Sequence, residues 1–124
     1  MTFYVAADFL RALTEPNHPY GEQAERMLAT RTVVTSPLAY LELLVDAESD
    51  EFNAVKLIAH LLDVVPVATD EDEQIVLKAA NYYDEGMAPF RAFHAATAET
   101  RSVPLVSTTV GHDTLGPKQV LLSD

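Results

Sequence analysis

The sequence has no cysteine and no tryptophan, and it contains only three lysines and four glycines in 124 residues. The absence of cysteine excludes disulfides, thiolate metal sites and cysteine nucleophiles. No apolar run approaches the roughly 18 uncharged residues that a membrane span needs. Residues 1–12 lack the basic start and the cleavage site of a signal peptide. We therefore expect a cytoplasmic protein without membrane attachment.

Positive charge is scarce. Eight Lys and Arg residues stand against 19 Asp and Glu residues, which gives a formal net charge of −11. Such a surface repels nucleic-acid phosphates, so stable RNA or DNA binding is disfavoured unless salt or cations screen the charge. The same balance suits the high-salt cytoplasm of a halophile, where counterions screen the self-repulsion. An ordinary acidic surface is the alternative interpretation.

Short β-forming segments alternate with helical patterns along the whole chain. Because parallel strands require crossover connections, this alternation predicts an α/β fold with three α/β/α layers and a central, mostly parallel sheet of four to five strands. The length predicts a single domain over residues 1–124. We expect strands at residues 2–6, 32–35, 63–67, 103–107 and 119–122, and helices at residues 8–14, 21–30, 36–47, 50–62, 69–85 and 90–101.

Local signals mark several of the predicted helix ends. Ser36 before Pro37 supplies a capping hydroxyl and a proline at the first turn. Thr69 followed by an acidic turn predicts a second capped start, and Gly86 predicts the end of that helix. The helix at residues 90–101 is rich in alanine, which favours close packing onto the sheet.

The carboxyl ends of the strands are the first place to search for a site, because ligands of open parallel sheets bind in the crevice beyond them. The first strand is followed by Ala6 and Asp8, and the fourth by residues 107–110. Glu42 and Arg91 lie on helices that would close over the same crevice. These side chains are therefore the candidates for chemistry.

Four segments of the chain read YVAADFL (residues 4–10), SPLAYLELL (36–44), FRAFHAATA (90–98) and STTVGHD (107–113). In this order they resemble motifs of the PIN-domain family of VapC-type ribonucleases. Each motif is weak by itself, but the four together, in the family's order and spacing, cover essentially the whole chain. The resemblance implies the three-layer fold expected above and a metal-dependent endoribonuclease activity.

Of the four acidic positions that the resemblance implies, only Glu42 is retained. Ala6, Arg91 and Thr109 replace the other three carboxylates, which PIN nucleases use to hold Mg²⁺ or Mn²⁺, hard cations that prefer oxygen ligands. A positive charge about 4 Å from the metal would cost on the order of 4 kcal/mol per unit of metal charge at an effective dielectric near 20. We expect no bound cofactor, or Mg²⁺ or Mn²⁺ if the site is active.

Each candidate also has a structural interpretation. Glu42 is either a residual catalytic and metal ligand or an ion-pair partner of Arg91, and we favour the ion pair. Asp8 and Asp113 are possible residual metal ligands beside Glu42, but helix capping by Asp8 and a turn-fixing role for Asp113 are favoured.

Two histidines complete the candidate set. His94 is either a general base or a packed, hydrogen-bonded histidine, and packing is favoured. His112 lies in a predicted turn, where a lone histidine is usually solvated.

The first functional hypothesis is an inactive or impaired nuclease homologue that acts as a binding or regulatory module. We expect a homodimer, and the resemblance implies a small antitoxin-like protein as a possible partner, with RNA bound only if the enzyme is active. The alternative is an active Mg²⁺- or Mn²⁺-dependent endoribonuclease, the toxin of a toxin–antitoxin pair, with a rearranged site. Alanine at position 6 suits an engineered knockout, whereas Arg91 and Thr109 do not, so we favour natural drift.

Overall fold

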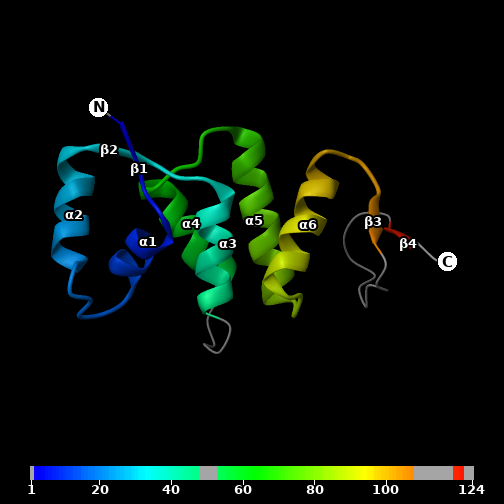
Figure 1. Cartoon of the computed structure of the whole chain (residues 1–124), viewed down its shortest axis with the longest axis horizontal. Helices are drawn as coiled ribbons and strands as arrows, with labels where there is room; N and C mark the ends of the chain where they lie inside the picture. Colours follow the sequence, from blue (N-terminus) through cyan, green and yellow to red (C-terminus); the bar gives the residue numbers. More distant parts are fainter. Residues whose placement is uncertain (1, 48–52, 108–118, 122–124) are drawn as a thin grey trace.

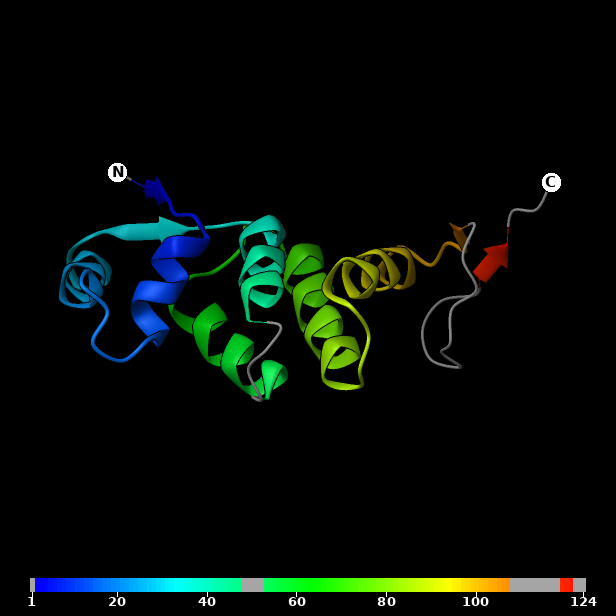
Figure 2. The same cartoon turned by 60° about the horizontal axis from the view of Figure 1, so that its bottom comes forward.

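The computed structural model describes residues 2–47, 53–107 and 119–121. The helices lie in a row, with β1 and β2 beside α1 and α2 at one end of the molecule and β3 and β4 beyond α6 at the other (Figures 1 and 2). In chain order the elements are β1 (Thr2–Tyr4), α1 (Ala7–Thr14), α2 (Gly21–Thr30), β2 (Thr32–Val34), α3 (Pro37–Asp46), α4 (Ala54–Val64), α5 (Asp70–Asp84), α6 (Pro89–Thr100), β3 (Leu105–Ser107) and β4 (Gln119–Leu121).

The strands form two separate parallel pairs. β1 pairs with β2 in a register that places Phe3 opposite Val33, and β3 pairs with β4 with Val106 opposite Val120. A single bridge joins Thr35 to residue 67 and extends the first pair on the β2 side. The first sheet therefore continues beyond β2, while β1 forms its other edge.

The described residues do not form the single sheet of four to five strands expected from the sequence. They form two two-stranded sheets instead, although the α/β class holds because parallel strands alternate with helices. One cause is that the predicted strand at residues 63–67 begins inside α4. Val64 ends this helix and Val65 is its C-cap, so Val67 is left to form the bridge to Thr35.

The sequence predicts the helices more closely than the sheet. The hydroxyl of Thr69 accepts a hydrogen bond from the Asp72 backbone N–H at 3.1 Å, which confirms the predicted cap of α5. Gly86, which follows this helix, has a φ of 103° that suits glycine. Ser36 is the N-cap of α3 and Pro37 begins the helix, as predicted. The predicted capping hydroxyl is wrong, because it is hydrogen-bonded to the hydroxyl of Tyr4 at 2.7 Å and accepts from no helix N–H.

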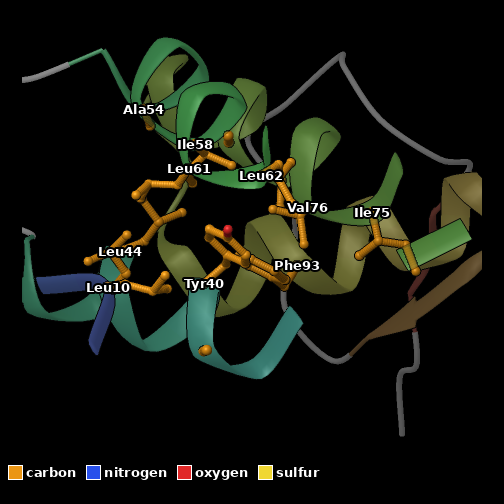
Figure 3. Packing of buried hydrophobic residues seen from close by; sticks show 14 of the residues in the cluster. Leu10, Tyr40, Leu44, Ala54, Ile58, Leu61, Leu62, Ile75, Val76 and Phe93 are labelled. Carbon is orange, nitrogen blue, oxygen red and sulfur yellow. The ribbon is translucent and has the colours of Figure 1, made fainter. Parts of the chain in front are cut away.

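The main core lies between helices and is centred on Tyr40 of α3, which is fully buried. Its hydroxyl donates a hydrogen bond to the carbonyl of Val65 at 2.8 Å, and this burial raises the pKa of Tyr40. Figure 3 shows this ring among Ile58 and Leu61 of α4, Val76 of α5 and Phe93 of α6, with Leu10 and Leu44 beyond it.

The alanine-rich helix α6 packs mainly on α5 and not on a sheet. Ala79 and Ala80 of α5 and Ala92, Ala95 and Ala96 of α6 are all buried. Small side chains at a helix contact let the two axes approach closely. The prediction of close packing was thus correct, but its partner is a helix. Within the described part of the chain, no helix is both long and apolar enough to cross a membrane.

Candidate active site

The first motif lies where β1 passes into α1. Ala6 is exposed and occupies the N-cap position with extended backbone, φ −97° and ψ 178°. Asp8 follows in the first helical turn and is also exposed. The structure therefore does not support Asp8 as the helix cap, although its negative charge suits the helix N-terminus.

The second and third motifs lie on α3 and α6, which contact each other. Glu42 is exposed in the middle of α3, and Arg91 is half-buried in the first turn of α6. In the described part of the chain, neither side chain forms an ion pair with the other, although four ion pairs occur elsewhere. The favoured Glu42–Arg91 pair is thus not observed.

The fourth motif is separated from the first. Ser107 ends β3, and β3 lies at the far end of the row of helices from β1 (Figures 1 and 2). Thr109, His112 and Asp113 lie outside the described residues. The structure therefore brings Glu42 and Arg91 onto neighbouring helices but leaves the ends of β1 and β3 apart, because these strands belong to different sheets.

The described residues at the family's acidic positions do not fit a divalent cation. Ala6 offers no ligand atom, Arg91 is a permanent cation, and Glu42 is the one carboxylate retained among these three positions. Across residues 2–47, 53–107 and 119–121 no group of three or more His, Asp or Glu side chains is arranged to hold a metal. His94 is exposed, contrary to the packed histidine that we favoured.

A cavity of about 600 Å³ opens between α1 and α2, and sequence reasoning missed it. Its wall includes a turn in which the Tyr20 backbone N–H donates to Nδ1 of His18 at 3.1 Å, with the two rings 6.0 Å apart. Asp8 is the one candidate from the sequence that lines it. The full lining comprises Asp8, Phe9, Arg11, Ala12, His18, Tyr20, Gln23, Ala24 and Met27. The turn-forming residues 16–19 marked a loop here but gave no sign of a cavity.

Several of the few cations are already paired with carboxylates. Arg11 of α1 contacts Asp46 of α3, and Arg101 contacts Glu71 at 2.8 Å. Lys78 lies 3.7 Å from Glu99, which also accepts a hydrogen bond from the hydroxyl of Tyr82. Because paired cations are less available to phosphate, these contacts reinforce the low affinity for nucleic acid that the net charge predicts.

Parallel strand pairs that alternate with helices along the chain define the class: an α/β domain. The family model described as PIN domain matches residues 8–109, so the chain belongs to the PIN-domain family. The chain matches no curated protein and no solved structure at a significant level.

Proposed function

We propose that this chain is a single PIN-like domain, of the type found in VapC ribonucleases, whose nuclease activity is lost or strongly impaired. It acts instead as a binding or regulatory module. The proposal rests on the replacement of three of the four expected acidic residues, by Ala6, Arg91 and Thr109.

The main support for this proposal is the position of Arg91. It is half-buried in the first turn of α6, a helix that contacts the helix bearing Glu42. A guanidinium keeps its charge at any accessible pH. This fixed positive charge on a helix that contacts α3 therefore opposes a divalent cation beside Glu42, while Ala6 supplies no ligand to offset that repulsion.

A cleavage assay with fluorescent RNA and Mn²⁺, run at low and high salt, tests the loss of activity. We expect no metal-dependent cleavage by the unmodified protein at either salt concentration. The triple variant Ala6→Asp, Arg91→Asp, Thr109→Asp should recover both divalent-ion binding and cleavage. A triple variant that folds but stays metal-blind would show that the site has been placed wrongly.

The second candidate function is an active Mg²⁺- or Mn²⁺-dependent endoribonuclease with a rearranged site of Glu42, Asp8 and Asp113. It is favoured by the exposure of Asp8 and Glu42, because neither side chain forms an ion pair with another described residue. Cleavage by the unmodified protein that is lost in Glu42→Ala would establish it. Glu25→Ala is the matched control, since Glu25 is also an exposed helical glutamate.

The partners follow from the same proposal. We propose a cytoplasmic homodimer that could also receive a small antitoxin-like protein, and that binds RNA only if the second candidate function holds. An antitoxin-like chain would meet a surface that carries Arg91 in place of a carboxylate, so an acidic contact segment suits it better than a basic one. The acidic surface is also compatible with a halophilic origin.

A further inference from the structure

β1 leaves one of its edges open. Strand N–H groups alternate between the two sides of the chain, and the Val5 N–H bonds to the Val34 carbonyl at 3.0 Å. The neighbouring backbone groups of Tyr4 therefore point towards the opposite edge, where the described residues contain no strand. Tyr4 itself is 59% exposed. Such an edge is a template for a further strand.

β3 and β4 form a strand pair whose central residues are exposed. Val106 is 53% exposed and Val120 is 41% exposed. The helix α6 touches β3, and β1 and β2 lie at the other end of the row of helices (Figure 1). A two-stranded sheet is at best marginally stable in water unless more strands or a helix cover it.

The distribution of charge limits which partner can bind the open edge of β1 and the β3–β4 pair. β1 reads Thr-Phe-Tyr, β3 reads Leu-Val-Ser and β4 reads Gln-Val-Leu, with no ionisable group other than the tyrosine phenol. The rest of the chain carries a net charge of −11. Two copies would repel each other across most of their surfaces, but the strand edges are places where they can meet without like charges in contact.

The connection between α6 and β3 favours exchange between copies. It consists of residues 101–104, which span at most about 14 Å when extended. Ser102 has a φ of 56°, a left-handed conformation that is unfavourable for a non-glycine residue, and Pro104 fixes its own φ. Short hinge loops under strain favour domain swapping, because a swapped arm need not turn back on its own domain.

We propose that a second copy of this chain supplies β3 and β4 to the open edge of β1, in a reciprocal, strand-exchanged dimer. Each copy carries both the edge and the arm, so two copies close the assembly with twofold symmetry. The result is the larger sheet that neither copy forms by itself. It also brings Ser107 of one copy towards Ala6 of the other, so the crevice is incomplete without the second copy. Strand exchange does not depend on whether the domain has lost metal binding.

Fluorescence energy transfer between two populations of the full chain tests the exchange directly. The sequence has no cysteine, so Thr2→Cys in one population takes a donor and Val120→Cys in the other takes an acceptor. Sedimentation at the same concentrations gives the oligomeric state. We expect a dimer with energy transfer between copies.

Two variants separate the exchange from other forms of association. Val106→Lys should convert the dimer to a monomer, whereas Val64→Lys, at an exposed valine of α4, should not. A Gly-Gly-Ser insertion after Ser102 should let the arm fold back, which gives monomers with transfer inside one doubly labelled chain. Circular dichroism establishes that each variant is folded.

Three outcomes would overturn the proposal. A dimer without energy transfer between copies would associate through another surface. An unmodified monomer with transfer inside one chain would be a closed domain that completes its own sheet. An unmodified monomer without transfer would leave the edge of β1 open in solution.

Discussion

The two strand pairs are built alike but are supported very differently. β1 and β2 are backed by buried residues, since Val33 is 4% exposed and the buried hydroxyl of Thr35 donates to the Val5 carbonyl at 2.7 Å. β3 and β4 have the same length and the same parallel pairing, but Val106 and Val120 face solvent. The difference shows that strand pairing alone does not make a core: one apolar face must be covered by another layer.

The largest expected effect contrasts the helical core with the exposed strand pair. Ile58→Ala removes most of a fully buried side chain of α4 from the main core and should lower the free energy of unfolding by about 2–5 kcal/mol. Val106→Ala, in the exposed pair, should change it by less than about 0.5 kcal/mol at concentrations that favour the monomer. Urea denaturation followed by circular dichroism measures both. Equal losses would mean that β3 is covered in the monomer.

The next effect concerns the buried hydrogen bond of Tyr40. Tyr40→Phe leaves the carbonyl of Val65 without its donor and should cost about 1–3 kcal/mol. Tyr20→Phe is the matched control, because Tyr20 is exposed. Urea denaturation at pH 8 measures the difference. A cost no larger than that of the control would show that water reaches this carbonyl.

The same tyrosine predicts a dependence of stability on pH. Burial raises the pKa of Tyr40 above its ordinary value, so above about pH 10 the unfolded chain loses a proton that the folded chain keeps. Stability should be unaffected below that pH and should fall as the pH rises beyond it. Urea denaturation at pH 8 and pH 11 should show a smaller fall in Tyr40→Phe than in the unmodified protein. An equal fall in both proteins would contradict the burial.

A smaller loss is expected at the start of α4. The carboxylate of Asp84 accepts hydrogen bonds from the backbone N–H groups of Ala54 at 2.7 Å and Val55 at 2.9 Å. Asp84→Ala should therefore lower the free energy of unfolding by about 0.5–2 kcal/mol. Asp63→Ala removes an exposed aspartate without such contacts and should have little effect. Thermal unfolding of the two variants compares them, and similar melting temperatures would argue against the cap.

The smallest effect is expected at the exposed pair of Arg101 and Glu71, which joins the end of α6 to the start of α5. Glu71→Gln should cost about 0.2–1 kcal/mol at low salt and less as salt screens the pair. Glu73→Gln removes a charge from the same helical turn without breaking an ion pair. Denaturation of both variants at low and high salt isolates the pair, and a salt-independent difference would contradict its electrostatic origin.

Most of the helices could be predicted from the sequence because their signals are local. Pro37, Thr69 and Gly86 each act within one or two helical turns, and the observed bounds of α3 and α5 lie close to the expected ones. The strand predicted at residues 63–67 was wrong in its first part, where α4 continues to Val64, because a short apolar run has no period that separates a strand from the end of a buried helix.

The arrangement of the site was less predictable, because it depends on contacts between distant segments. Motif order identified the family, and the family model supports it over residues 8–109. Sequence patterns could not show that Glu42 and Arg91 form no ion pair. The relative position of these two side chains depends on how α3 and α6 pack against each other, which no local pattern encodes. Nor could sequence patterns show that β1, which precedes Ala6, and β3, which ends at Ser107, belong to separate sheets. Local sequence patterns predict where each strand lies along the chain. Which strand β3 pairs with depends instead on the path of the connection after α6.

Titration calorimetry of the unmodified protein with Mn²⁺ tests the central claim most directly, namely that this PIN domain has lost its metal site. With Ala6, Arg91 and Thr109 in place of carboxylates, we expect no specific binding heat at either low or high salt. Stoichiometric Mn²⁺ binding that disappears in Glu42→Ala but persists in Glu25→Ala would contradict the claim and would establish a working metal centre built around Glu42.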